Sequence, residues 1–447
     1  MLADEFTFGN ARRAVAGIAT VLSRDHAGGL LLVGYDTRFL ADQFAREAAL
    51  ILKKRGFGVA VSDHPIPTPV LSFETIRRKA AGALNFTASH NPPKYLGLKF
   101  SSADGAPALP DITKQIEREI AKIDEVEKPA DGDFERFDAA PAYLSALGRF
   151  VDVSAFSGFP VALDFRFGTS VGYLDAFFER AGARVVKIHA DRDPLFGGQS
   201  PQCSAKELVE LGEVVRRNGA RLGLATDGDA DRFGILDEKG AYYGANTILP
   251  LVAWDLYDSR RSTRGIARSV ATTHALDAVA KTFGVELHET PVGFKYIGEL
   301  LLDGKIAIGG EESAGLTVEG HVPDKDGILA DVLVARAVQS SGKTLAELQR
   351  DLEAAIGPYF SDRLDLTISE GEKRLLAEKR KNPPSRFGAR KVESVNLIDG
   401  LKLSFEGGAW VLLRESGTEP VARFYAEARS RGDLDGLLRD GRRFLQE

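Results

Sequence analysis

The chain has 447 residues, 44% of them hydrophobic and 27% charged, which is enough for two to four globular domains of roughly 100–200 residues each. Its formal net charge of −6 comes from 58 basic and 64 acidic residues, and without a basic surplus a general nucleic-acid-binding protein is excluded. The chain has one cysteine, Cys203, so an intramolecular disulfide is excluded. The sequence shows no secretory signal and no run of about 18 apolar residues, so we expect a cytoplasmic protein without a membrane partner.

Short apolar segments alternate with amphipathic segments through the first part of the chain. We expect strands over 30–34, 59–61 and 82–86, a helix over 42–54, and a second helix over 111–124 whose isoleucines recur on one face. This alternation predicts an α/β fold with mainly parallel sheets.

Changes in composition divide the chain into four predicted domains. The stretch 126–133 is charged and contains a proline and a glycine, so the first α/β domain is expected to span 1–133. Similar α/β units are predicted over 134–238 and 239–355, with strands expected near 161–164, 184–189, 266–271 and 306–308. The tail, 356–447, has short alternating strands and a final helix, which predicts a smaller α+β domain.

The first loop with chemical potential follows strand 82–86 and reads Thr-Ala-Ser-His-Asn-Pro-Pro. Two prolines end the regular structure there, so Ser89 is expected at the C-terminal edge of a strand, where open α/β sheets bind ligands. A plain turn or helix cap is an equally good interpretation, since serine and asparagine are common turn residues. His90 and Lys99 are candidate proton-transfer groups, although a solvated side chain is the commoner fate of a lysine.

The second loop places Asp227, Asp229 and Asp231 at alternate positions between two apolar strands. Three such carboxylates can converge on one hard cation, and left alone they would repel one another. An EF-hand calcium loop is the rival interpretation, but Arg232 stands where that loop needs a glycine, and the flanks resemble strands and not helices. Magnesium is therefore the expected ion.

The third loop, Gly-Gly-Glu-Glu-Ser-Ala-Gly over 309–315, again follows an apolar strand. The carboxylates of Glu311 and Glu312 suit the hydroxyl donors of a sugar, although a surface acidic turn is a fair alternative. Downstream, Lys325 is a candidate acid or base, provided that burial or a like charge lowers its pKa.

The fourth loop, Arg-Glu-Ser-Gly-Thr-Glu-Pro over 414–420, is followed by Arg423. The guanidinium of Arg414 can grip a phosphate with two hydrogen bonds, and a glycine-centred turn offers backbone amides to an anion. This pattern predicts a phosphate-binding loop, with a polar hairpin turn as the alternative.

These four loops, in this order, resemble those of the α-D-phosphohexomutase superfamily, the phosphoglucomutase/phosphomannomutase family. The matching strings are Thr-Ala-Ser-His-Asn-Pro-Pro, Asp-Gly-Asp-Ala-Asp-Arg, Gly-Glu-Glu-Ser and Arg-Glu-Ser-Gly-Thr-Glu-Pro, starting at residues 87, 227, 310 and 414. The resemblance implies three related α/β domains with mixed, mainly parallel sheets and a smaller C-terminal α+β domain, all around a central cleft.

The resemblance also implies a mechanism for a hexose phosphate substrate. A phosphorylated serine, here Ser89, exchanges its phosphoryl group with the sugar through a 1,6-bisphosphate, and glucose 1,6-bisphosphate acts as activator and intermediate. Mg²⁺ would be bound by Ser89, Asp227, Asp229 and Asp231. The implied catalytic residues are Ser89, His90, Lys99, Arg232 and Lys325. The implied substrate-binding residues are Gly293, Lys295, Glu311, Ser313, Arg414, Ser416, Gly417, Thr418 and Arg423.

Two segments resemble those of glucose-type members. Relatives that act on mannose or glucosamine phosphates usually carry methionine or glutamine where this chain has Glu312, and the stretch 290–295 is similar to a glucose-type specificity loop. We therefore expect interconversion of glucose 1-phosphate and glucose 6-phosphate by a monomer or homodimer. A phosphomannomutase, a phosphoglucosamine mutase, a non-catalytic sugar-phosphate-binding homologue and a magnesium phosphatase are the alternatives.

The start of the chain departs from the family pattern. Members usually begin with a Phe-Gly-Thr segment that forms the first strand and carries an arginine, whereas residues 6–13 of this chain resemble the part of the family pattern that lies after that segment. We expect the first strand of the first domain to be missing, with one edge of its sheet exposed.

Overall fold

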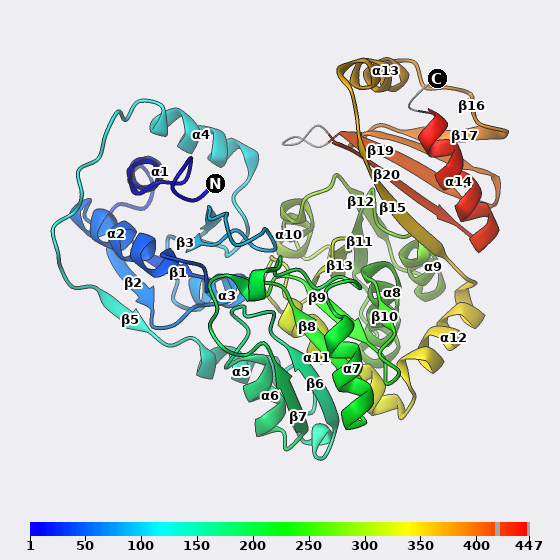
Figure 1. The fold of residues 1–447 in the computed structure, drawn as a ribbon, viewed down its shortest axis with the longest axis horizontal. Coiled ribbons are helices and arrows are strands. Elements are labelled where there is room, and N and C mark those ends of the chain that lie inside the picture. The colour runs from blue at the N-terminus through cyan, green and yellow to red at the C-terminus, as the bar shows by residue number, and fades with distance from the viewer. Residues whose placement is uncertain (416–420, 445–447) are drawn as a thin grey trace.

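The computed structural model describes residues 1–415 and 421–444. Three α/β domains and a C-terminal antiparallel domain follow one another from the blue to the red end of the chain (Figure 1). The predicted fold class, α/β with a smaller α+β domain at the C-terminal end, is confirmed. Among the described residues, no helix is both long and apolar enough to cross a membrane.

The first sheet has the strand order β4-β3-β1-β2-β5. Its strands are β1 (Leu30–Tyr35), β2 (Gly58–Ser62), β3 (Gly82–Phe86), β4 (Leu98–Ser102) and β5 (Glu135–Phe137). All neighbours are parallel except β3 and β4. Because β5 pairs with β2, the first sheet extends past the predicted domain boundary at residue 133.

Helices cover both faces of this sheet, namely α1 (Phe8–Leu22), α2 (Ala41–Lys54), α3 (Thr68–Arg77) and α4 (Pro110–Ile120). Among the described residues, none before α1 joins the sheet, so β4 is an edge strand. That edge is partly covered, since the Ala108 N–H donates to the Phe100 carbonyl and the Ser102 N–H to the Ala106 carbonyl.

The second and third sheets repeat the same plan. In the second, β6 (Pro160–Asp164) lies between the parallel strands β7 (Arg184–Ile188) and β8 (Leu222–Thr226), and the antiparallel β9 (Phe233–Leu236) and β10 (Tyr242–Tyr243) follow β8. Its helices are α5 (Ala140–Leu147), α6 (Leu174–Arg180) and α7 (Val209–Asn218). Since β10 pairs with β9, this sheet also extends past its predicted boundary, at residue 238.

In the third sheet, β11 (Gly265–Ser269) lies between the parallel strands β12 (Leu287–Thr290) and β13 (Ile306–Glu311), and β14 (Gly315–Val318) runs antiparallel to β13. Its helices are α8 (Ala245–Arg260), α9 (Ala275–Phe283), α10 (Phe294–Leu302), α11 (Gly327–Ser341) and α12 (Leu345–Ile356). In all three sheets, the third parallel strand therefore leads through a turn into an antiparallel neighbour.

The C-terminal domain is a single antiparallel sheet with the strand order β15-β20-β19-β18-β17-β16. Its elements are β15 (Phe360–Thr367), α13 (Glu370–Lys381), β16 (Arg386–Phe387), β17 (Arg390–Asn396), β18 (Leu401–Phe405), β19 (Trp410–Glu415), β20 (Val421–Ala428) and α14 (Arg431–Phe444). Leu403, Val411, Phe424 and Leu437 are fully buried in a core that belongs to this domain alone.

Helix α11 joins the second and third domains into one body. Eleven of its 15 residues are buried, as expected for a helix that is apolar on all sides and lies inside a protein. It packs against β8 and β9 of the second sheet and against β14 of the third. The turns that follow β8 and β13 are therefore held in a fixed relation to each other.

Candidate functional site

The turn after β8, residues 227–232, lies where the first three domains meet, and we call it the acidic turn. From the first domain, the Thr68 N–H donates to the Asp229 carbonyl at 2.9 Å. From the third, the Gly327 N–H at the start of α11 donates to the Ala230 carbonyl at 3.1 Å. The first and third domains thus both bind the backbone of the acidic turn, so its carboxylates do not have to make these contacts and can face inward.

Asp227, Asp229 and Asp231 are each at most 1% exposed. One carboxylate oxygen from each lies within 4.8 Å of the others. The Oδ1 atoms of Asp229 and Asp231 are buried without a hydrogen-bond partner among the described residues, so they are free to bind a hard cation. Strands flank the turn on both sides, which contradicts an EF-hand.

The structure places Ser89 against this triad. Its Oγ donates to Oδ2 of Asp227 at 3.0 Å, and its side chain is buried. Its backbone has a left-handed φ of +51°, a conformation that costs a serine energy and is typical of functional turns. The Ser89 N–H donates to Oγ1 of Thr87 at 2.9 Å, which helps to hold this turn.

His90 lies beside the serine. Its Nδ1 is 3.5 Å from the Ser89 Oγ, which is too long for a strong hydrogen bond. Burial, followed by the positive charge of Arg232, lowers the pKa of His90 to about 4. The imidazole is therefore neutral near pH 7.

Lys99 and Lys325 both contact the acidic turn. The Lys99 Nζ lies 2.6 Å from Asp229 and 2.9 Å from Asp231, and the Lys325 Nζ lies 3.2 Å from Asp231. Burial works to lower the pKa of each lysine, but the neighbouring aspartates outweigh it and raise both pKa values above the usual range. The condition for Lys325 to act as a base, a lowered pKa, is not met, and both lysines stay charged.

Arg232 closes the acidic turn. Its backbone N–H donates to Oδ1 of Asp227 at 3.1 Å, and the Nε of its side chain lies 3.8 Å from Oδ1 of Asp231. Burial opposes its charge, but Asp231 and Asp227 raise the pKa of the guanidinium, so it adds a fixed positive charge beside His90.

The end of β13 with the turn that follows it, residues 311–314, is called the glutamate turn below. It lies against the end of the acidic turn, where the Phe233 N–H donates to the Ala314 carbonyl at 3.3 Å. Glu311 is 4% exposed, and its Oε1 accepts the Gly293 N–H at 2.8 Å. Burial, followed by the charge of Glu312, raises the pKa of Glu311 to about 7. Ser313 is partly exposed in the same turn.

The segment 290–295 lies beside this glutamate turn. Gly293, which donates to Glu311, has a φ of +133° that side chains rarely adopt, and it directly precedes α10. Lys295 extends over the ring of Tyr296, with its Nζ 5.2 Å from the ring centroid. Of these two predicted substrate-binding residues, only Gly293 contacts the glutamate turn through a hydrogen bond that the structure describes.

The C-terminal domain contributes two arginines. Arg414 on β19 and Arg423 on β20 lie directly opposite each other in the sheet, so their side chains share one face. The Arg414 Nε donates to Oδ2 of Asp399 at 2.8 Å, and the same oxygen accepts the Val292 N–H at 3.0 Å. The predicted phosphate-binding residues Ser416, Gly417 and Thr418 lie outside the described residues.

Sequence reasoning missed residues that hold the site from outside the four loops. Thr68 donates its hydroxyl to Oδ2 of Asp229 at 2.6 Å, and Asp399 joins Arg414 to the backbone of segment 290–295. Thr68 follows a proline at a helix start, and Asp399 lies in a hairpin turn, so the local sequence of each indicates only a turn or cap. Only the packing of separate domains shows their part in the site.

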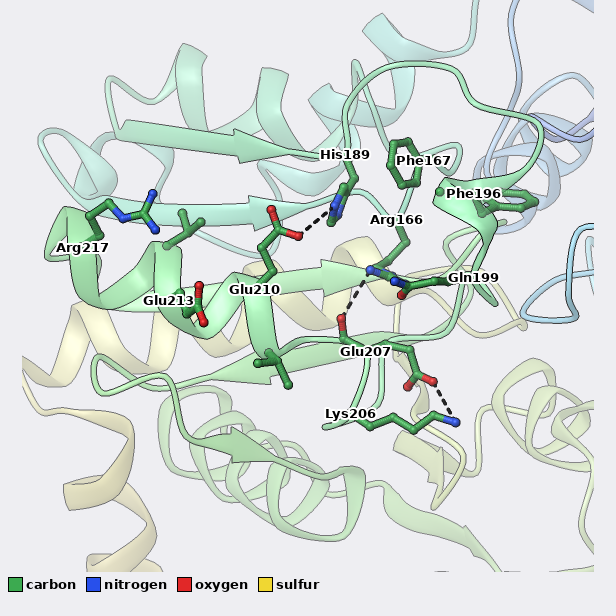
Figure 2. A pocket seen from close by; sticks show the side chains of 13 residues that line it. Arg166, Phe167, His189, Phe196, Gln199, Lys206, Glu207, Glu210, Glu213 and Arg217 are labelled. Atoms are coloured by element: carbon green, nitrogen blue, oxygen red, sulfur yellow. Dashed lines mark hydrogen bonds and ion pairs between the residues drawn. The ribbon is translucent and has the colours of Figure 1, made fainter.

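A cavity of about 460 Å³ lies elsewhere, between α7 and the loops that follow β6 and β7. Figure 2 shows Arg166, His189, Phe196 and Glu210 around it. Neither Ser89 nor any aspartate of the acidic turn lines this cavity. It is therefore separate from the place where the first three loops meet.

Family models match the chain from one end to the other. The phosphoglucomutase/phosphomannomutase alpha/beta/alpha domain I matches residues 1–127, domain II matches 141–240, domain III matches 245–355, and the C-terminal domain matches 333–441. The order of these matches agrees with the four domains of the structure.

Whole proteins match over similar lengths. The chain is 30% identical to a phosphoglucomutase/phosphomannomutase of Thermococcus kodakarensis, over 99% of this chain and 96% of the relative. It is 31% identical to a phosphoglucosamine mutase of Caldicellulosiruptor saccharolyticus, over 92% of this chain and 88% of the relative. The crystal structure of a Thermus thermophilus protein assigned as a phosphomannomutase has a TM-score of 0.87 and 36% identity, covering 100% of this chain and 96% of that one.

The close approach of the acidic turn to Ser89 predicts that Gly228 cannot carry a side chain. A Cβ at Gly228 would lie 2.8 Å from the Ser89 carbonyl oxygen and 3.1 Å from Pro201. We expect Gly228→Ala to lower the free energy of unfolding by about 1–3 kcal/mol through overpacking, measured by urea denaturation. Gly9→Ala, where the added Cβ meets only an ordinary contact at 3.8 Å, is the matched control. Equal unfolding midpoints for the two variants would contradict this packing.

Proposed function

The chain belongs to the phosphoglucomutase/phosphomannomutase family, and we propose that within it the protein interconverts α-D-glucose 1-phosphate and glucose 6-phosphate. The observation that carries the proposal is the contact between the Ser89 Oγ and Asp227 of the buried acidic triad. A serine held on a cation site is suited to carry a phosphoryl group, because phosphoryl transfer depends mainly on positioning and charge neutralisation.

Ser89 is the proposed phosphoryl carrier. In the first half-reaction the Oγ–P bond of phosphorylated Ser89 breaks as a P–O bond forms to the free hydroxyl of a hexose monophosphate, and the proton that leaves this hydroxyl ends on the Ser89 Oγ. After the bisphosphate reorients, the second half-reaction returns the other phosphoryl group to the serine. Lys99, Lys325 and Arg232, whose pKa values the neighbouring aspartates raise, are positively charged near neutral pH and would offset the negative charge of the phosphoryl oxygens.

The acidic triad is the proposed Mg²⁺ site, held by Asp227, Asp229, Asp231 and the Ser89 side chain. The free, buried Oδ1 atoms of Asp229 and Asp231 support this assignment, because hard cations prefer carboxylate oxygens. Bound there, Mg²⁺ would act as a Lewis acid toward the phosphoryl oxygens.

The two ends of the sugar phosphate would be held by different domains. Glu311 and Ser313 of the third domain suit sugar hydroxyls, and the adjacent Arg414 and Arg423 of the fourth suit the phosphate that does not react. A grip on both ends favours a mutase over a phosphatase, because a phosphatase does not need to hold the far end of its substrate.

Glucose is the proposed sugar because of the Glu311-Glu312-Ser313 turn and the segment 290–295. The Glu312 Oε2 is buried without a hydrogen-bond partner among the described residues, so it is free to accept a sugar hydroxyl. Glucosamine phosphate is the second candidate, since a 31% identical relative is a phosphoglucosamine mutase. We place the reaction in the cytoplasm, where the buried, unpaired Cys203 would stay reduced.

A coupled assay on glucose 1-phosphate with Mg²⁺ and a trace of glucose 1,6-bisphosphate tests the function. We expect Ser89→Ala to abolish turnover, because it removes the phosphoryl carrier, while substrate still protects the variant against thermal unfolding. Ser101→Ala, on the neighbouring strand β4, is the control and should keep wild-type turnover. Normal turnover by Ser89→Ala would refute the mechanism.

Metal removal tests the triad separately. We expect Mg²⁺ to raise the thermal unfolding midpoint of the wild-type protein, and Asp229→Asn to lose most of that shift, because the amide removes one anionic ligand. A chelator should stop turnover, and added Mg²⁺ should restore it. A midpoint that Mg²⁺ shifts equally in both proteins would remove Asp229 from the metal site.

The raised pKa of Glu311 predicts a pH-dependent KM. The ionised carboxylate accepts hydrogen bonds from sugar hydroxyls more strongly than the protonated acid does, so KM should fall as pH rises through about 7. The substrate phosphate titrates near this range, so Glu311→Gln, which should lose the added pH dependence, is the control. Because folding raises the pKa of Glu311 from 4.5 to about 7, this residue costs stability progressively as pH rises from 4.5 to about 7, and Glu311→Gln should gain stability relative to the wild type over that range. Parallel KM profiles for both proteins would contradict the prediction.

A further inference from the structure

The turn that carries Ser89 encloses a buried arginine from another part of the first domain. Arg38 follows the central strand β1 and is 1% exposed. Its Nη2 donates to the carbonyl oxygens of Ser89 at 2.7 Å and Asn91 at 2.6 Å, and its Nη1 to those of Pro92 at 2.9 Å and Tyr95 at 3.0 Å. Four backbone carbonyls of the serine turn therefore converge on one guanidinium.

The remaining side-chain donor of Arg38 is also used. Its Nε donates to Oδ2 of Asp36 at 2.9 Å, and Oδ1 of the same carboxylate accepts the Arg38 N–H at 3.0 Å. A guanidinium has five N–H donors in one plane, and here each has an acceptor. Asp36 thus anchors the plane to the end of β1, and the other four donors are directed at the turn.

The turn needs an external donor of this kind. Pro92 and Pro93 have no N–H group, and the left-handed φ of Ser89 prevents a regular ladder. Carbonyl groups buried without a partner each cost about 1–3 kcal/mol. Among the described residues, Pro92 alone of the four also accepts a backbone N–H, from Tyr95 at 3.0 Å, so Arg38 supplies the hydrogen bonds that the other three carbonyls lack.

The second domain holds the same unit from the other side. The guanidinium of Arg38 lies over the ring of Phe196, with its Cζ 4.9 Å from the ring centroid. The hydroxyl of Thr37, the residue before Arg38, donates to the Phe167 carbonyl at 2.8 Å. The hydroxyl of Ser200 donates to the His90 carbonyl. The position of Arg38 and that of the turn are thus fixed together against the domain that carries the acidic triad.

An equivalent arginine follows the central strand of the second domain. The Arg166 N–H donates to Oδ1 of Asp164 at 2.8 Å, and its Nε donates to the Gln202 carbonyl at 3.1 Å. Figure 2 shows its guanidinium beside Gln199 and the Glu207 backbone. An aspartate and an arginine two residues apart thus hold a long loop in both domains, but only Arg38 holds the turn with the proposed phosphoryl carrier.

We propose that Arg38 is a positioning residue that fixes the backbone of residues 89–95 and so keeps the Ser89 Oγ against Asp227. This inference rests on the proposed function. Arg38 contacts Ser89 only through its backbone carbonyl, and no described hydrogen bond joins it to Asp227, Asp229 or Asp231, so it acts on the rate of phosphoryl transfer and not on sugar binding.

The test compares Arg38→Lys with the wild-type protein. An ammonium has three donors and no plane, so it cannot serve five acceptors. We expect kcat to fall about 100-fold, as for a misplaced reacting group, with KM within roughly threefold. Amide hydrogen exchange over residues 87–97 should rise about tenfold or more in the same variant. Arg12→Met, which breaks a partly buried ion pair between α1 and α2, is the control and should leave kcat and this exchange unchanged.

A second variant keeps the test decisive if Arg38→Lys does not fold. Phe196→Leu removes the ring over the guanidinium and leaves every donor in place, so it should reduce kcat and raise the same exchange to a smaller degree. Wild-type kcat and wild-type exchange in the folded variants would overturn the proposal. If the wild-type protein turns over no hexose phosphate, the proposed function fails, whereas the exchange measurement still decides the role of Arg38.

Discussion

Three carboxylates buried on one turn are the constraint on which the rest of the structure depends. Asp227, Asp229 and Asp231 would repel one another in a medium of low polarity unless positive charge surrounded them. The protein supplies Lys99 from the first domain and Lys325 from the third, and it leaves carboxylate oxygens free for a cation. Domains far apart in the sequence are thus bound to one electrostatic centre, and that centre is where we propose phosphoryl transfer takes place.

The repeated sheet plan explains why the chemistry gathers at that centre. In each α/β domain the third parallel strand turns back into an antiparallel neighbour, and that turn carries Ser89 in the first domain, the acidic triad in the second and Glu311 in the third. The Ser89 Oγ, which donates to Asp227, joins the first of these turns to the second, and the Phe233 N–H, which donates to the Ala314 carbonyl, joins the second to the third. One local arrangement, used three times, therefore positions the proposed phosphoryl carrier, the proposed metal site and the proposed sugar contact.

Much of this could be predicted from the sequence, because the strands before Ser89, Asp227 and Glu311 are apolar runs that end in polar turns, and such local patterns are readable. Strands β5 and β10, which extend the first and second sheets past residues 133 and 238, could not be placed from the sequence, since both are short and their pairing depends on other strands. The charge state of Lys325 could not be predicted either, because its pKa depends on Asp231, 94 positions away in the chain. Sequence likewise shows Arg38 only as a charged residue after a strand, and four of its five acceptors appear only when the serine turn folds around it.

The most direct test of the central claim follows one phosphoryl group through a single turnover. The wild-type protein is phosphorylated with glucose 1,6-bisphosphate, freed of ligand and mixed with an excess of glucose 6-phosphate in Mg²⁺. We expect peptide mapping to find the phosphate on Ser89, and this phosphate to leave the serine as bisphosphate is formed in equal amount. Phosphate on another residue, or its release as inorganic phosphate, would contradict the account.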